Sequence, residues 1–155
     1  MHLVFLGIET SNEAALQEQG KVGAMYDARA AVATLTEVGL RSYGLFVLGL
    51  PGETAEDRAA IRELACSLGL DVASFGIYTQ YAGSPAARTQ PGLTPESLTR
   101  TNWELDSELA RVQREMMRAF YMRPSVILRH LWRREITFNR LVKGAWTMVG
   151  PHPAL

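Results

Sequence analysis

The fold of this chain is decided by residues 43–54, which read YGLFVLGLPGET. The stretch from Tyr43 to Gly49 carries no charge and mixes β-branched with aromatic side chains, which predicts a strand buried on both faces of a parallel sheet. Turn-forming residues follow, and Thr54 begins a pattern typical of a capped helix. In parallel α/β folds, loops and helix N-termini converge at the C-terminal ends of the strands. A ligand site is therefore expected at this junction.

Length and composition predict a globular chain without a metal site of its own. The 155 residues are enough for one domain with a core, and 47% of them are hydrophobic. Cys66 is the single cysteine, which excludes an intrachain disulfide and is too few for an iron–sulfur cluster or a structural zinc. His2, His130 and His152 have no partner at metal-site spacing. No apolar run reaches the ~18 residues of a membrane span and no secretory signal is visible, so a reducing, cytoplasmic location is expected.

Strands and helices alternate along residues 1–93. Short apolar runs predict further strands at residues 3–8 and 72–78. A helical pattern separates each pair of neighbouring strands, so the order is strand, helix, strand, helix, strand. Such an order predicts three parallel strands joined by right-handed crossover helices, which is an α/β fold.

Local signals mark the ends of both crossover helices. Thr54 and Asp57 have the spacing of a capping box, and Gly39 and Gly69 end the two helices. The apolar residues at helical spacing are Ala28, Ala31, Val32, Leu35 and Val38 in the first helix and Ile61, Leu64, Ala65 and Leu68 in the second. These stripes are expected to face the sheet.

Residues 94–155 are predicted to form a separate helical tail with the opposite charge. Residues 1–110 hold 7 Lys/Arg against 14 Asp/Glu, and residues 111–155 hold 9 against 2, so the two parts carry −7 and +7. Apolar spacing predicts a long helix from Glu96 to Phe120, a second helix after Pro124 and a third around Phe138 to Trp146.

The basic residues of the tail lie among aromatic side chains. They are Arg129, Arg133, Arg134, Arg140 and Lys143. The pattern fits an interfacial membrane helix or a nucleic-acid surface, but a basic face that is solvated or meets the acidic first unit is the favoured interpretation. Of the two functional alternatives, peripheral membrane contact is preferred because Trp with Arg at helical spacing suits a membrane interface, and no nucleic acid is expected.

Several segments resemble the radical S-adenosylmethionine (radical SAM) enzymes. Residues 5–10 (FLGIET), 44–54 and 73–78 (ASFGIY), with Gly83-Ser84-Pro85, resemble the later strands of their barrel. The helical sequence RAFYMRPS-x-ILRHL that ends at Leu131 resembles the group that also carries an N-terminal cobalamin (B12)-binding domain. The resemblance implies a C-terminal half of a TIM-like radical SAM barrel at residues 1–93, followed by an α-helical basic extension at residues 94–155.

The resemblance also implies cofactors and the residues that bind them. The complete enzyme would use S-adenosylmethionine and a 4Fe-4S cluster, with cobalamin as a further cofactor of the group. Glu9 would contact the ribose or amino group of S-adenosylmethionine, Gly49, Leu50 and Pro51 would form a shelf beside adenine, and Tyr78 would stack on adenine or substrate. The alternatives are an acid that complements a helix dipole, a tight turn without ligand, and an aromatic that only packs.

Three other residues near these positions receive mainly structural interpretations. Glu53 is expected to be an acid in the first turn of a helix, and Cys66 is expected to be a small buried hydrophobe. Tyr81 shares the stacking alternative with the aromatic residue at the end of the third strand. No residue is assigned a catalytic role.

The sequence lacks the residues with which the family binds its 4Fe-4S cluster. The three-cysteine loop and the glycine-rich segment after the second strand have no counterpart, and residues 80–85 read QYAGSP where the family usually has PYPGTP. The chain is therefore expected to be a fragment, a truncated gene product or a degenerate paralogue that is inactive alone and needs the N-terminal half of the barrel or a partner chain. The alternative is a non-catalytic interaction module.

Overall fold

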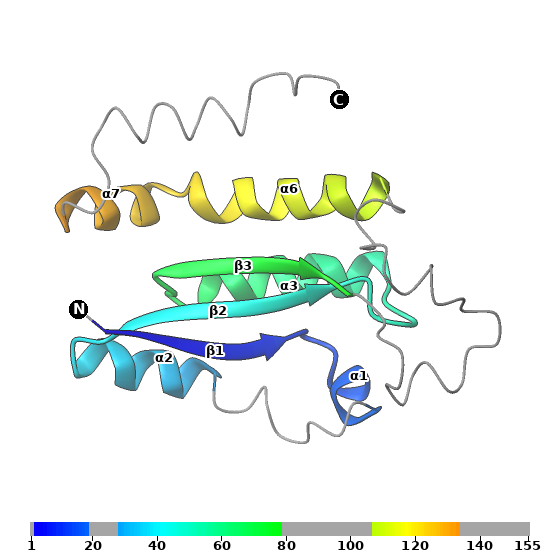
Figure 1. The fold of residues 1–155 in the computed structure, drawn as a ribbon, viewed down its shortest axis with the longest axis horizontal. Coiled ribbons are helices and arrows are strands. Elements are labelled where there is room, and N and C mark those ends of the chain that lie inside the picture. The colour runs from blue at the N-terminus through cyan, green and yellow to red at the C-terminus, as the bar shows by residue number, and fades with distance from the viewer. Residues whose placement is uncertain (1, 19–27, 79–106, 134–155) are drawn as a thin grey trace.

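The computed structural model describes residues 2–18, 28–78 and 107–133 (Figure 1). In chain order the elements are β1 (Leu3–Glu9), α1 (Glu13–Glu18), α2 (Ala28–Glu37), β2 (Arg41–Leu48), α3 (Ala55–Ser67), β3 (Val72–Ile77), α6 (Ser107–Tyr121) and α7 (Pro124–Trp132). The predictions for Tyr81, for Gly83-Ser84-Pro85, for the start of the long helix at Glu96 and for the third tail helix lie outside the described residues.

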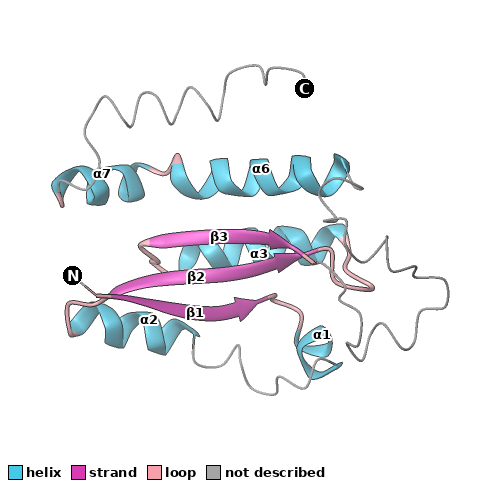
Figure 2. Cartoon of the chain, in the orientation of Figure 1, coloured by secondary structure: helices cyan, strands magenta, loops and turns pink. Residues whose placement is uncertain are grey.

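The strands form a parallel sheet in the order β1-β2-β3, as Figure 2 shows. Phe5 of β1 stands opposite Tyr43 of β2, which stands opposite Val72 of β3. The predicted α/β class with three parallel strands is confirmed, and the sheet is open rather than closed into a barrel. The crossovers between the strands contain α2 and α3, and α6 and α7 come after the last strand in the sequence.

The two faces of the sheet are covered unequally. Along β2, Ser42, Gly44, Phe46 and Leu48 are buried, whereas the residues between them are half-buried. The prediction that this strand is buried on both faces is therefore wrong. The hydrophobic core lies on the face where α2 and α3 pack, and the described apolar residues of the other face do not belong to this core.

We call this second side the open face, defined by Leu3, Phe5, Tyr43, Leu45, Val47 and Val72. Phe5 is 60% exposed and Leu3 39% exposed, although both lie in a strand. The ring centroids of Phe5 and Tyr43 lie 4.8 Å apart in an edge-to-face contact across the two strands. A contiguous apolar surface of this kind is typical of a site that receives a ligand or another protein layer.

The crossover helices begin and end as their local signals predict, with one exception. Thr54 caps α3, and its hydroxyl and the Asp57 carboxylate form the reciprocal bonds of a capping box. Ile61 and Ala65 of α3 are fully buried. Val38, predicted to belong to the buried stripe of α2, is instead 63% exposed because that helix ends at Glu37.

Helix α6 covers the outer edge of β3. The Tyr121 hydroxyl donates to the carbonyl of Ala73 at 2.7 Å and accepts from its N–H at 3.2 Å, and the Gln113 amide donates to the carbonyl of Phe75. Side chains of α6 thus satisfy backbone groups that an edge strand leaves unpaired. Among the described residues, β1 is the other edge of the sheet and pairs with β2 alone. The sheet can therefore be extended at β1 and not at β3.

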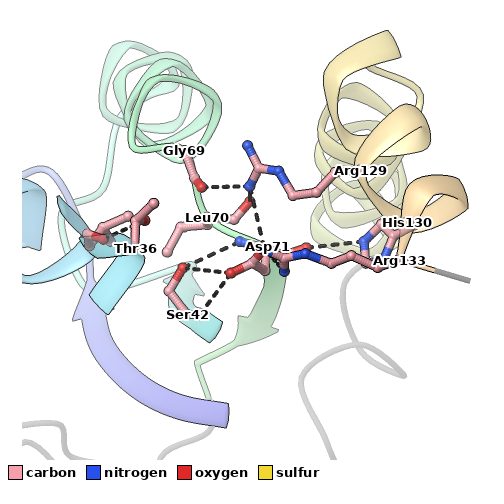
Figure 3. A network of polar contacts seen from close by, with 9 residues as sticks. Thr36, Ser42, Gly69, Leu70, Asp71, Arg129, His130 and Arg133 are labelled. Carbon is pink, nitrogen blue, oxygen red and sulfur yellow. Dashed lines mark hydrogen bonds and ion pairs between the residues drawn. The ribbon is translucent and has the colours of Figure 1, made fainter. Parts of the chain in front are cut away.

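A polar network ties α7 to the N-terminal ends of β2 and β3 (Figure 3). Asp71, which is nearly buried, accepts from the N–H of Ser42 at 3.0 Å and pairs with Arg133 at 2.6 Å and Arg129 at 3.5 Å. The His130 ring nitrogen Nε2 lies 3.1 Å from the Asp71 carbonyl oxygen. For Arg129 and Arg133, the expectation that the basic tail meets the acidic first unit is confirmed.

Candidate functional site

The candidate site lies where the three strands end. Glu9 ends β1, Gly49 follows β2 and Tyr78 follows β3. Because the strands are parallel, these predicted residues lie together at the C-terminal ends of the strands, which we call the C-terminal edge of the sheet. The loop after β1 is joined to the start of α3, because Asn12 donates to the Asp57 carboxylate at 3.1 Å. The loops after the first two strands are thereby held together.

Glu9 has a strained backbone. Its φ of 66° is the one positive value of a non-glycine residue among the described residues. The N–H of Thr10 donates to the carbonyl of Ile8 at 2.9 Å and closes a tight turn around Glu9, and the pairing register with β2 shifts at this point. A left-handed conformation of this kind costs about 1–3 kcal/mol and persists where the surroundings impose it, often at functional sites.

The turn directs the Glu9 carboxylate onto the open face. A Cβ built on Gly7 would lie 3.1 Å from Oε1 of Glu9, so the acid folds back across the position that a side chain at Gly7 would take. Gly7 pairs with Leu45, which places that position on the open face. The Glu9 carboxylate thus lies on the apolar open face, and a carboxylate there can accept hydrogen bonds from a bound ligand.

Two backbone N–H groups donate the hydrogen bonds that shape the loop after β2, one to a side chain and one to a carbonyl. Gly49, at φ +80°, donates its N–H to Oε1 of Glu53 at 3.0 Å, and the Glu53 N–H donates to the Leu50 carbonyl at 2.9 Å. Leu50 is buried and Pro51 is exposed. Leu109 of α6 occupies the space beside Gly49. The space that the missing side chain of Gly49 leaves is filled by Leu109 and is not open to a ligand. The predicted adenine shelf would therefore involve Leu50 and Pro51 more than Gly49.

Tyr78 continues the ladder of β3 by one residue. Its N–H donates to the Leu48 carbonyl at 2.7 Å, and its side chain is half-buried at the same edge as the loop after β2. This bond fixes the direction in which the chain leaves the sheet. Ligand stacking by Tyr78 stays a prediction.

The chain is similar to a methyltransferase and to a methylthiotransferase. It is 26% identical, over 158 aligned positions, to an uncharacterized methyltransferase of Pyrococcus horikoshii, with 92% of this chain and 34% of that protein covered. It is 32% identical over 114 positions to the ribosomal protein uS12 methylthiotransferase RimO of Desulforudis audaxviator, with 72% of this chain and 24% of that protein covered. No protein-family profile matches the chain. The chain thus spans about a third or less of the length of these two relatives.

We expect Gly49→Ala to destabilise the fold by about 2 kcal/mol. A non-glycine residue at this positive φ costs about 1 kcal/mol, and the new Cβ would lie 2.6 Å from Cδ1 of Leu109, a clash that adds a similar amount. The matched control is Gly52→Ala, because Gly52 has φ +78° but no atom within 4 Å of its Cβ position. Urea unfolding should show a smaller loss for the control, and equal losses would contradict the contact with Leu109.

The prediction that Glu53 lies in the first turn of a helix is wrong. Thr54 is the N-cap of α3, so Glu53 precedes the helix and does not lie in its first turn. Its side chain is only 4% exposed, and its Oε1 accepts from Gly49 and lies 3.4 Å from Nε of Arg58. Oε2 has no hydrogen-bond partner among the described residues. Arg58 also reaches Glu108 at 3.4 Å, so this buried acid links the loop after β2 with the start of α6.

Burial raises the pKa of Glu53 above its usual value of 4.5, against the opposing effects of the Gly49 N–H and Arg58. A folded-state pKa above the unfolded one means that the folded chain holds the proton longer. The contribution of Glu53 to the free energy of unfolding is therefore fully present below pH 4.5. It is lost as the pH rises through the folded-state pKa, by up to about 1.4 kcal/mol per pH unit. In urea unfolding across this range, Glu53→Gln should lack the decline, and identical pH profiles would refute the assignment.

Cys66 does not belong to the candidate site. It is half-buried on α3, with its sulfur 4.0 Å from the carbonyl oxygen of Ala119 on α6. Within residues 2–18, 28–78 and 107–133, no group of three or more His, Cys, Asp and Glu side chains is placed to hold a metal ion. The described helices also include none that is long and apolar enough to cross a membrane.

Three residues of the site were not predicted from the sequence. They are Gly7, which leaves room for the Glu9 carboxylate, Arg58, which pairs with Glu53, and Leu109, which packs on the loop after β2. Gly7 could have been found, since a glycine two residues before an acid at a strand end suggests a side chain that folds back. Leu109 lies 60 residues beyond Gly49 in the chain, and no local signal connects the two.

Proposed function

We propose that this chain is part of a radical SAM enzyme that transfers a methyl-bearing group, and that S-adenosylmethionine binds at the C-terminal edge of its sheet. The observation that carries this proposal is the strained Glu9, whose carboxylate lies over the open face. The names of both relatives describe transfer of a methyl or methylthio group, which supports this reaction class. The resemblance of residues 5–10 and 44–54 supports the radical SAM family.

The residues at this edge fit S-adenosylmethionine. A carboxylate accepts hydrogen bonds from an amino group or from ribose hydroxyls, which is the role proposed for Glu9. The exposed Pro51 and the half-buried Tyr78 supply apolar and aromatic surface for adenine at the same end of the sheet, whereas Leu50 is buried and offers only its backbone. When bound, S-adenosylmethionine supplies the reactive group, and this chain's residues bind and orient it.

A 4Fe-4S cluster does not fit the residues of this sequence. Such a cluster is held by several thiolates, and Cys66 is the single cysteine, half-buried on α3 away from the strand ends. In this proposal the cluster ligands come from residues outside this sequence. Dependence on cobalamin is a finer form of the proposal and rests only on the resemblance of the segment that ends at Leu131.

The rest of the enzyme would cover the open face. Both relatives are about three to four times longer than the part that matches this chain. Because α6 occupies the β3 edge, further strands would be added beside β1, where Leu3 and Phe5 are exposed. We propose that this addition is the N-terminal half of the barrel, supplied by the same polypeptide or by a partner chain.

Amide chemical shifts can test where the cofactor binds. We expect S-adenosylmethionine, titrated to millimolar concentration into the ¹⁵N-labelled chain, to shift the amides of Gly7, Glu9, Leu50 and Tyr78. Glu9→Gln should remove these shifts, and the control Glu37→Gln, at an exposed acid of α2, should not. Absence of shifts at this edge, or shifts that survive Glu9→Gln, would refute the proposal and favour a non-catalytic module.

A further inference from the structure

The outward side of α7 carries large apolar side chains that nothing in the described structure covers. Trp132 is 86% exposed and Leu128 is 64% exposed, and they lie one helical turn apart. Met122, between α6 and α7, is 41% exposed. The inward residues Val126 and His130 are buried against the α/β unit, so α7 has apolar residues on both sides. A helix of that composition is expected to have a partner on its outward side.

The outward side of α6 is basic. Arg114 and Arg118 are exposed and have no hydrogen-bond or ion-pair partner in the described residues. The acids nearby are engaged, since Glu115 pairs with Arg111 at 2.6 Å and Glu108 lies 3.4 Å from Arg58. Figure 1 shows α6 and α7 end to end along the β3 side of the sheet. Along this side, the unpaired arginines of α6 are therefore followed by the exposed apolar side chains of α7.

We propose that this side docks on an anionic lipid surface. We call it the outer surface, defined by Arg114, Arg118, Met122, Leu128 and Trp132. An interfacial helix inserts Trp and Leu at the headgroup boundary while Arg side chains attract anionic headgroups, and this is the combination that α6 and α7 present. Arg129 and Arg133 do not take part, because Asp71 holds them on the inward side.

Two other occupants fit the outer surface less well. Single-stranded nucleic acid is bound by arginines and stacked aromatics, but two of the three apolar residues of the outer surface, Met122 and Leu128, are not aromatic. A second copy of the chain offers Arg114 and Arg118 no acidic partner on its own outer surface, because the nearby acids Glu108 and Glu115 already pair with arginines. In an anionic lipid surface, the headgroups attract the arginines and the headgroup–acyl boundary accommodates the apolar side chains.

Vesicle flotation of the full chain tests the proposal. We expect binding to vesicles of equal parts phosphatidylglycerol and phosphatidylcholine, at least tenfold weaker binding to phosphatidylcholine alone, and weakening by salt. Trp132→Glu and Leu128→Glu should each lower binding about tenfold or more, because the apolar side chain is lost and a negative charge is added. The matched control is Val38→Glu on α2, whose side chain is 63% exposed. None of these substitutions touches the core, so circular dichroism should be unchanged.

The charged part is tested by a second set of variants. Arg114→Gln and Arg118→Gln should each weaken binding to the anionic vesicles about fivefold and flatten its salt dependence. In a chain with Trp103→Phe and Trp146→Phe, the remaining Trp132 emission should shift to the blue only when vesicles are added. Equal binding to neutral vesicles, no binding, or a Trp132 already shielded without lipid would overturn the proposal. Two other results would also overturn it if vesicle binding is absent. One is binding to poly-U in a gel-shift assay that Trp132→Glu abolishes, and the other is dimerisation in sedimentation velocity that Trp132→Glu abolishes.

Discussion

Replacing Asp71 with alanine is expected to lower the free energy of unfolding by about 3 kcal/mol. The substitution leaves the buried N–H of Ser42 without its acceptor and leaves Arg129 and Arg133 without their counter-charge. Breaking a buried ion pair by removing one partner costs about 3–5 kcal/mol, and the lower end applies because both arginines are partly exposed. Urea unfolding followed by circular dichroism measures the loss.

Two further variants separate the causes of this loss. Asp71→Asn keeps an oxygen for the Ser42 N–H but removes the charge, so it should cost about half as much. Glu63→Ala, at an exposed acid of α3, should change the free energy of unfolding by less than about 0.5 kcal/mol. Because Asp71 holds α7 through two arginines, hydrogen exchange of α7 amides should accelerate in the alanine variant. An alanine variant as stable as the Glu63 control would show that the network contributes nothing.

The second large effect is expected at Glu9, whose replacement should weaken binding of S-adenosylmethionine. In an enzyme completed with its N-terminal half, Glu9→Gln should weaken S-adenosylmethionine binding by roughly 10- to 150-fold, because a charged hydrogen bond in a partly dry site is worth about 1.5–3 kcal/mol. Calorimetry on folded protein measures the affinity. Equal affinity for variant and wild type would return Glu9 to a structural role.

Glu9→Gly distinguishes a strained functional residue from a structural one. Glycine adopts a φ of 66° without steric cost, so this variant should raise the free energy of unfolding by about 0.5–1 kcal/mol while it also loses affinity. Glu9→Gln keeps the strain and should leave stability nearly unchanged. A less stable glycine variant would mean that contacts of the Glu9 side chain hold the fold, which would contradict a site that tolerates strain for binding.

Local signals predicted the elements of the fold well. The capping box at Thr54 and Asp57 and the glycine that ends α3, Gly69 at φ +75°, act within a few residues of the chain, and both are present as predicted. The parallel arrangement followed from the order of strands and helices. Val38 was assigned to the wrong side because helix ends are the least certain part of a periodic pattern.

The sequence predicted where Glu9, Gly49 and Tyr78 lie relative to the sheet, but not the contacts around them. Glu9, Gly49 and Tyr78 were placed at one edge because parallel strands end together. The burial of Glu53 and its link through Arg58 to Glu108 arise only when α6 returns to the sheet. A periodic pattern shows that a helix has an apolar stripe, but it does not identify the surface that the stripe will meet.

The sequence by itself determined the α/β class, the capped start of α3 and the meeting of Glu9, Gly49 and Tyr78 at one end of the sheet, because each depends on neighbouring residues or on chain order. Only the tertiary structure decided which side of β2 is buried, since an apolar run such as Tyr43 to Leu48 reads the same whether one face is covered or two. It also decided which arginines of the tail meet an acid, because Arg129 reaches Asp71 across 58 residues while Arg118 stays exposed. Long-range packing sets both outcomes, and packing is not encoded in local periodicity.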